Sequence, residues 1–346
     1  MAMAGKNGVG VMRGAAGFDV VTGGAGFIGS HLVDRLLADG RRVRVIDNFV
    51  SGGPHNLAHV DAGAPLELIE ADIRERQAMA DLLQGAERVF HLAALADIVP
   101  SIQRPDDYYD SNVTGTFNVL QAARQGGARR FVYAASSSCY GIPDCYPTAE
   151  TAAIQPQYPY ALTKYLGEQM VLHWGQVYGL STVSLRFFNV YGPRARTSGT
   201  YGAVFGVFLA QLLAGEPLTI VGDGKQTRDF TFVTDVADAV VTAAAADVAG
   251  EVFNVGTGND VSVNRLVELL GAEKSVNIPK RPGEPDCTRA DVAKIASQLG
   301  WQAGVPIEDG VRIMLSNIDY WRDAPVWSRE AIAESTKDWF RYLDRG

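Results

Sequence analysis

The chain has 346 residues, of which 47% are hydrophobic and 20% are charged, and this composition excludes a disordered chain or a coiled coil. Its net charge of -8 comes from 31 basic and 39 acidic residues without a block of Lys or Arg. That balance argues against nucleic acid or an anionic membrane surface as a partner.

The segment 1–17 is rich in Gly and Ala and lacks the apolar core of a signal peptide, so we expect a flexible extension. No apolar stretch reaches the roughly 18 residues that a membrane helix needs, and we expect no membrane span. The cysteines Cys139, Cys145 and Cys287 are widely spaced and predict neither a disulfide framework nor a metal site. This usage indicates a reducing compartment, and we expect a cytoplasmic protein.

From Phe18 onward, short β-branched runs alternate with segments of helical spacing. This alternation predicts an α/β fold, a Rossmann-type doubly wound parallel sheet. The expected strands cover residues 19–22, 42–47, 66–70, 88–93, 130–137 and 181–187. Two long helices are expected over about 106–125 and 159–178, and their apolar residues on more than one face indicate a subunit interface.

After Asn189 the sequence becomes richer in Gly and Pro, which predicts a smaller C-terminal α/β domain. Residues 228–246 then resemble a strand and helix that return to the first sheet. We therefore predict interleaved domains, with residues 18–188 and 229–255 in the first and 189–228 and 256–346 in the second.

Three glycines, Gly23, Gly26 and Gly29, lie between the first strand and the first helix. The first permits a tight turn, the second lets a pyrophosphate approach the backbone, and the third lets the helix pack on the strand. The helix N-terminus adds N–H donors for phosphate oxygens. The motif predicts a dinucleotide site.

Asp47 ends the second expected strand, downstream of the glycine-rich turn, where a carboxylate accepts hydrogen bonds from the adenosine ribose. The same carboxylate repels a 2′-phosphate, so we expect NAD as the cofactor. Asp72, after the third strand, is expected either to contact the adenine amino group or to cap a helix.

Tyr160 and Lys164 are four residues apart, on one face of the helix that begins near Pro159. Ser136 stands upstream of this pair, at the end of an apolar strand. Because parallel strands deliver their carboxyl ends to one crevice, we expect the three side chains to meet over the nicotinamide.

These residues carry a resemblance to a known family. TGGAGFIG, HLAA at 91–94, the Ser136 strand, YALTK, LRFFNVYGPR at 185–194 and GDGKQTRDF at 222–230 occur in order. As a set they resemble the extended short-chain dehydrogenase/reductases that act as nucleotide-sugar epimerases or dehydratases, over about residues 19–314.

The resemblance implies that Tyr160 deprotonates a sugar hydroxyl while NAD takes the hydride from the same carbon, which leaves a 4-keto sugar. Lys164 and the nicotinamide are expected to lower the pKa of Tyr160, and Ser136 is expected to hold the reacting oxygen. Asn112 is expected to fix the local backbone. The cofactor site implied in full comprises Gly23, Gly26, Phe27, Ile28, Gly29, Asp47, Asn48, Asp72, Ile73, Leu92, Ala93, Ala94, Asn112, Tyr160 and Lys164.

The fate of the 4-keto sugar divides this family. Its dehydratases and decarboxylases resemble one another in a Glu at the position of Ser138, and dehydratases usually have an Asp at that of Ser137. Without a carboxylate at either position, we expect 4-epimerisation with a recycling cofactor. A nucleotide-sugar 4-ketoreductase and a non-catalytic NAD-binding sensor are the alternatives.

For the substrate, the resemblance implies that Asn189, Arg228 and Arg281 bind the diphosphate and that Ser136, Ser137, Ser138 and Tyr160 contact the sugar. Thr288, seven residues after Arg281, corresponds to a gate beside the sugar C2, where a small residue admits an N-acetyl group. Residues 198–205 resemble the corresponding loop of epimerases that prefer N-acetylated UDP-sugars.

Several choices about the substrate stay open at this stage. Arg289 could instead fill the space beside the sugar C2, or could mark an acidic sugar. The nucleotide base is open too, although uridine is the commonest in the family. The resemblance also implies a homodimer through the two long helices.

Overall fold

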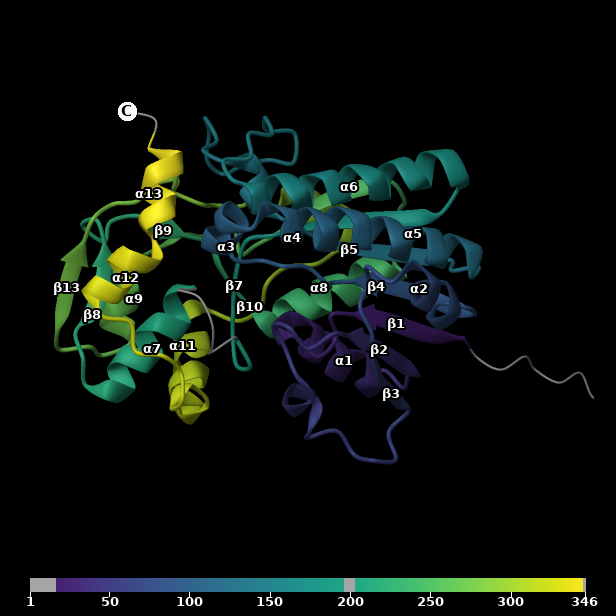
Figure 1. Ribbon diagram of the computed structural model, residues 1–346, viewed down its shortest axis with the longest axis horizontal. Helices are drawn as coiled ribbons and strands as arrows, with labels where there is room; N and C mark the ends of the chain where they lie inside the picture. The colour runs from purple at the N-terminus through teal and green to yellow at the C-terminus, as the bar shows by residue number, and fades with distance from the viewer. Residues whose placement is uncertain (1–16, 196–202, 345–346) are drawn as a thin grey trace, which may run out of the picture.

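The computed structural model describes residues 17–195 and 203–344. Seven parallel strands form one sheet in the order β11-β6-β5-β4-β1-β2-β3 (Figure 1). The strands are β1 (Phe18–Thr22), β2 (Val43–Asp47), β3 (Leu66–Glu70), β4 (Ala86–His91), β5 (Arg130–Ser136), β6 (Ser181–Phe187) and β11 (Glu251–Val255). This is the predicted doubly wound sheet. The predicted N-terminal extension lies almost wholly outside the described residues.

Helices cover both faces of this sheet (Figure 1). One face packs against α1 (Phe27–Ala38) and α8 (Val233–Ala245), which also contact each other. The other face packs against α2 (Arg76–Leu82), α5 (Thr116–Gln125) and α6 (Pro159–Tyr178). Buried Val, Leu and Phe side chains from alternate strand positions separate into one apolar core on each face.

The first of the two long helices is interrupted. It consists of α4 (Pro105–Tyr109), a π-helical segment η2 (Asp110–Gly115) and α5, whereas α6 runs unbroken over the predicted range. The π-helical segment contains Asn112, whose Oδ1 accepts from the N–H of Leu95 (2.8 Å) and whose Nδ2 donates to the carbonyl of Leu95 (3.0 Å). Such segments mark functional sites in many helices.

The strand expected to return to the first sheet was misplaced. Residues Phe230–Phe232 form β10, which pairs with β7 (Asn189–Tyr191) in a separate two-stranded sheet. The helix that follows, α8, does pack on the first sheet, and β11 then joins that sheet beside β6. A short apolar run carries no information about its pairing partner, so the sequence could not distinguish the two strands.

A third apolar core gathers the smaller elements of the C-terminal half. Its residues come from β7, β10, α7 (Val204–Ala214), β8 (Leu218–Val221), β12 (Val261–Ser262), α9 (Val263–Leu269), α11 (Ile307–Ser316) and η4 (Ile318–Trp321). At its edge, β9 (Thr227–Arg228) pairs with β12, and β13 (Ser275–Ile278) pairs with β8. The boundaries predicted for the two domains stay a prediction. Nowhere in 17–195 or 203–344 is a helix both long and apolar enough to cross a membrane.

Short elements and the last helices complete the site region. The helix α3 (Ile98–Gln103) follows β4, and η1 (Pro54–Leu57) and η3 (Ser137–Tyr140) follow β2 and β5. After α10 (Ala293–Leu299) and α11, the chain ends in α12 (Arg329–Ser335) and α13 (Lys337–Leu343). α13 packs on α3, so the C-terminal segment contacts the helix that follows β4. In Figure 1, α13 lies beside the C-terminal elements.

Candidate active site

One continuous cavity of about 890 Å³ runs from the glycine-rich turn to the C-terminal elements. It opens at the carboxyl ends of β1 and β4, where the strand order reverses, which is the place where doubly wound sheets bind ligands. The cavity is lined by the predicted residues Gly23, Gly26, Phe27, Ile28, Gly29, Asp47, Asn48, Ile73, Leu92, Ala93, Ala94, Ser136, Ser137, Ser138, Tyr160, Lys164, Asn189, Arg228, Arg281 and Thr288.

The glycine-rich turn leaves no room for side chains. Gly23 has a φ of +71°, and a Cβ there would lie 2.7 Å from the backbone nitrogen of Ala93. A Cβ on Gly29 would lie 2.1 Å from the carbonyl oxygen of Gly23. The backbone therefore lines the cavity directly, ahead of the N-terminus of α1, and this arrangement fits a dinucleotide pyrophosphate.

Asp47 is buried at the end of β2, and its carboxylate accepts hydrogen bonds from the backbone N–H groups of Ala25 (3.0 Å) and Phe49 (2.9 Å). Burial raises the pKa of this carboxyl, which the backbone donors partly offset. It faces the cavity at the position where a ribose would hydrogen-bond to it. The residues present thus fit an NAD molecule.

Two predicted cofactor residues do not line the cavity. Asp72 is engaged by Asn48 Nδ2 (2.9 Å) and Arg74 Nη2 (2.8 Å), and the Arg74 guanidinium lowers the pKa of this carboxyl to about 2. Asn112 is buried behind Leu95 and also donates to Thr163 Oγ1 (3.0 Å). Asn112 therefore holds the backbone that forms the cavity wall to the first turns of α6.

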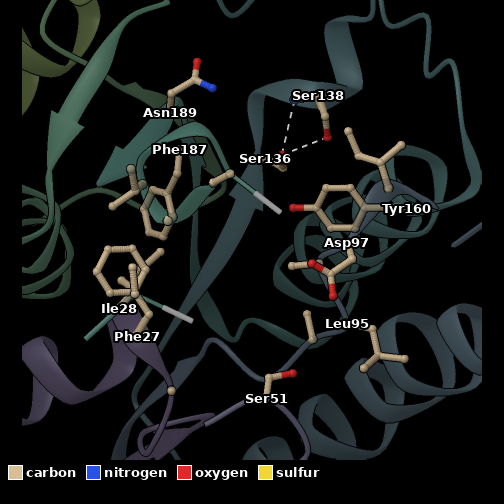
Figure 2. Close-up of a pocket in the computed structure, with 18 of the residues that line it drawn as sticks. Phe27, Ile28, Ser51, Leu95, Asp97, Ser136, Ser138, Tyr160, Phe187 and Asn189 are labelled. Atoms are coloured by element: carbon tan, nitrogen blue, oxygen red, sulfur yellow. Dashed lines mark hydrogen bonds between the residues drawn. The ribbon is translucent and has the colours of Figure 1, made fainter. Parts of the chain in front are cut away.

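Ser136, at the carboxyl end of β5, lines the cavity together with Tyr160 and Lys164 of α6. The hydroxyl of Tyr160 points toward Ser136, whose Oγ lies 2.8 Å from Ser138 Oγ (Figure 2). Pro159 starts α6 at its first position, where its missing N–H costs nothing, and so sets Tyr160 in the first turn.

The pKa values of the pair differ from the expected pattern. Burial is the largest influence on Tyr160 and raises the pKa of its phenol, although the hydrogen bond with Ser136 lowers it. Burial lowers the pKa of Lys164 to about 7, and its Nζ lies 4.3 Å from the centre of the Tyr133 ring. Desolvation dominates the Tyr160 pKa in the described protein, and the expected lowering by Lys164 together with the nicotinamide stays a prediction.

At the other end of the cavity, Glu284 lies between the two predicted diphosphate ligands. Its carboxylate is 3.1 Å from Arg281 Nη1 and 3.8 Å from Arg228 Nη2. Thr288 Oγ1 donates to Asn189 Oδ1 (2.8 Å), which joins the predicted gate to the third diphosphate ligand.

Two further predictions about the substrate concern Arg289 and the loop 198–205. Arg289 is not among the described residues that line the cavity; it donates to the carbonyl of Gly258 (2.8 Å) instead. Residues 198–202 of the loop compared above lie outside the described residues.

The sequence analysis missed three residues of this region. Buried Asp229 accepts from the backbone N–H groups of Thr257 (2.8 Å), Gly258 (3.1 Å) and Ala290 (3.0 Å), which fixes the segments that carry Arg228 and Thr288. Trp339 of α13 and Asp97 both line the cavity. Asp229 directly follows Arg228 in a motif that was recognised; the other two had no signal of spacing.

The fold and the site together define a dinucleotide-dependent enzyme with the Ser, Tyr and Lys set of the short-chain dehydrogenase/reductases. Residues 20–256 match the family described as "NAD dependent epimerase/dehydratase family", and the chain belongs to this family. NAD is its cofactor.

The chain is similar to UDP-sugar enzymes of more than one activity. It is 39% identical to a UDP-glucose 4-epimerase of Mycolicibacterium smegmatis over 84% of this chain and 95% of that protein. It is 34% identical to UDP-glucuronic acid decarboxylase 1 of Arabidopsis thaliana over 86% of this chain and 69% of that protein. The structure of a Thermotoga maritima UDP-glucose 4-epimerase with UDP-glucose is 34% identical, with a TM-score of 0.81 over 88% of this chain and 98% of that one.

Proposed function

We propose that this protein is an NAD-dependent 4-epimerase of a UDP-sugar, a neutral hexose or N-acetylhexosamine. The observation that carries the proposal is the group of hydroxyls at the end of β5. Ser136 and Ser138 hydrogen-bond each other and, with Ser137, line the cavity where family members that eliminate or decarboxylate resemble one another in a Glu. The similarity to 4-epimerases supports it.

In this proposal the sugar lies with its C4 hydroxyl at Tyr160 Oη, within reach of Ser136 Oγ. The glycine-rich turn and Asp47 would hold NAD, which would supply the acceptor and donor of the C4 hydride. Tyr160 takes the hydroxyl proton and gives it back, and Ser136 holds the oxygen as its charge changes. Arg228 and Arg281 bind the diphosphate through planar guanidinium groups. These roles are proposals for the named residues.

The test is incubation of the purified protein with UDP-, dTDP-, GDP- and CDP-hexoses without added cofactor, followed by chromatography and measurement of dinucleotide released on denaturation. We expect interconversion of a C4 epimer pair, with UDP as the preferred base, and NAD or NADH in the purified protein. Recovery of no dinucleotide together with a stoichiometric requirement for NADPH would assign the 4-ketoreductase alternative. Accumulation of a 4-keto-6-deoxy sugar would assign elimination instead, with Asp97 as the available carboxylate.

A further inference from the structure

Asp97 places a carboxylate in the sugar part of the cavity. It precedes α3 at the N-cap position, where an Asp usually accepts hydrogen bonds from the first turn of the helix. Here the side chain makes no such capping bond. It lines the cavity, and its carboxylate lies beside the ring of Tyr160 (Figure 2). The Asp97 side chain therefore borders the cavity near Tyr160.

The backbone holds this carboxylate in place. The N–H of Asp97 donates to Tyr108 Oη (3.1 Å), and Tyr108 is only 2% exposed. The Tyr108 ring meets the Tyr160 ring edge to face, with 6.5 Å between the centroids. Asp97 therefore has a fixed position relative to Tyr160, at whose hydroxyl the proposed function places the sugar C4. Its charge also contributes to the raised pKa of Tyr160, so it acts on the reacting end of the cavity.

A sugar acid would bring a second carboxylate close to Asp97. The arginines of the cavity that could bind this carboxylate are paired with acidic residues of the protein. Arg194 pairs with Asp34 (2.6 Å). Arg228 and Arg281 share Glu284 at the diphosphate end. Arg289, the residue that could have marked an acidic sugar, lies outside the cavity lining. Asp97 therefore brings a negative charge to the part of the cavity that contains Tyr160.

During epimerisation the sugar ring presents first one side of C4 and then the other to the Asp97 carboxylate, which stays in place. A hydride that leaves one face of C4 and returns to the other requires the sugar ring to turn over above the same cofactor. The groups at C3 and C5 that flank C4 then exchange places, so the C5 substituent faces Asp97 in one of the two orientations. A hydroxymethyl group can donate a hydrogen bond to a carboxylate, whereas a carboxylate at C5 is repelled by it.

We infer that Asp97 makes the site selective for neutral sugars, by accepting a hydrogen bond from a sugar hydroxyl and by repelling sugar acids. This inference rests on the proposed function, and it separates this chain from relatives such as the UDP-glucuronic acid decarboxylases. Two like charges about 6 Å apart at an effective dielectric of about 20 predict a preference of roughly 10- to 100-fold.

The test measures the dissociation constants of UDP-glucose and UDP-glucuronic acid by isothermal titration calorimetry. The NAD-loaded full chain is compared with Asp97→Asn and Asp97→Ser, and with Asp81→Asn as a control that removes an exposed carboxylate on α2. We expect the wild type and Asp81→Asn to bind UDP-glucose at least 10-fold more tightly. In both Asp97 variants the ratio of the two constants should fall by 10-fold or more, chiefly through tighter binding of UDP-glucuronic acid, with NAD content unchanged.

Two results would overturn the inference in different ways. If the wild type binds both nucleotide sugars equally, or if the ratio in Asp97→Asn and Asp97→Ser equals that in the wild type, Asp97 does not select the sugar and the epimerase proposal stands. If the wild type binds neither compound, the proposed nucleotide-sugar function fails, and this inference fails with it.

Discussion

Single residues decide the chemistry of this site through their surroundings. Tyr160 is partly buried, desolvation raises the pKa of its phenol, and the protein groups alone leave it protonated at neutral pH. We propose that its role as a proton acceptor depends on positive charge from Lys164 and the oxidised nicotinamide. Tyr160, Lys164 and Ser136 could be predicted from residue type and spacing. A separation of four residues places two side chains on one face of a helix, and the end of a parallel strand faces the ligand crevice. Asp97 could not be predicted as a site residue, because an Asp just before a helix is the usual signal for an N-cap.

Tyr160→Phe removes the proton acceptor and keeps the ring in contact with Tyr108. We expect kcat to fall by roughly 10²-fold or more, the usual scale for loss of a general acid or base, while the dissociation constant for the UDP-sugar changes little. Steady-state kinetics and calorimetry measure the two effects. Full activity in Tyr160→Phe would remove the residue from the reaction.

Thr288 lines the cavity and donates to Asn189 Oδ1 (2.8 Å). If it forms the gate beside the sugar C2, Thr288→Tyr should abolish turnover of the N-acetylated UDP-hexose by steric exclusion and spare UDP-glucose. Thr288→Ser, which keeps the hydroxyl and stays small, is the matched control. The gate is wrong if the wild type rejects N-acetylated sugars or if Thr288→Tyr still converts them.

His91 is fully buried and bonded to Thr22 Oγ1 (2.7 Å) and Thr116 Oγ1 (2.9 Å), and burial lowers its pKa to about 3. The unfolded chain, with a His pKa of about 6.5, binds more protons between pH 3 and 6.5, so the free energy of unfolding falls as the pH decreases through this window. From pH 7.5 to 5 the loss from this residue is about 2 kcal/mol.

Urea denaturation at the two pH values measures the loss. His91→Gln should be less stable than the wild type at pH 7.5. Because Gln cannot be protonated, the free energy of unfolding of this variant should fall by about 2 kcal/mol less than that of the wild type on acidification to pH 5. His31, whose pKa burial lowers to about 4, still titrates in both proteins. An unchanged pH dependence in His91→Gln would contradict the assignment.

At the scale of elements, the C-terminal helix α13 joins parts of the chain that no local pattern links. Trp339 donates from Nε1 to the carbonyl of Pro282 (2.7 Å), and its ring lies 5.4 Å from the Arg281 guanidinium and 6.2 Å from the Tyr158 ring. Gln103 of α3 donates to Asp338 (2.9 Å). Strands and helices with strong periodicity were predictable, but these contacts join distant parts of the sequence and depend on tertiary packing alone.

Trp339→Ala removes a face on which Arg281 rests. We expect the KM for the UDP-sugar to rise by roughly 5- to 30-fold, as about 1 to 2 kcal/mol of cation–π contact and packing is lost, with kcat and NAD content little changed. Trp339→Phe keeps a ring under the guanidinium and should restore most of the affinity. Tyr342→Ala, on the exposed side of the same helix, is the control. Equal KM values in all four proteins would show that α13 does not position Arg281.

At the scale of the whole molecule, one stripe of α6 stays exposed on the described chain. Leu162, near the start of the helix, is 45% exposed, and Val177, near its end and on the same side, is 54% exposed. The neighbouring α4 exposes Tyr109. Exposed apolar residues on a long helix are typical of a two-fold subunit contact, and the interface expected from the sequence on this helix stays a prediction.

We predict a dimer at micromolar concentration by light scattering. Val177→Glu places a charge in the stripe and should yield monomers, whereas Leu213→Glu on α7, which is 37% exposed, should leave the dimer intact. A monomeric wild type would contradict the predicted interface.

The continuity of the cavity has a consequence for the lifetime of each enzyme molecule. In the proposed reaction, cofactor and sugar occupy this one cavity, so a 4-keto sugar that escapes before it is reduced leaves behind a dinucleotide in the wrong redox state. Each escape silences one active site until that dinucleotide is reoxidised or exchanged. The number of catalytic cycles before silencing would then be a partition ratio between return of the hydride and loss of the ketone, and we expect cavity-lining residues such as Trp339 to influence it.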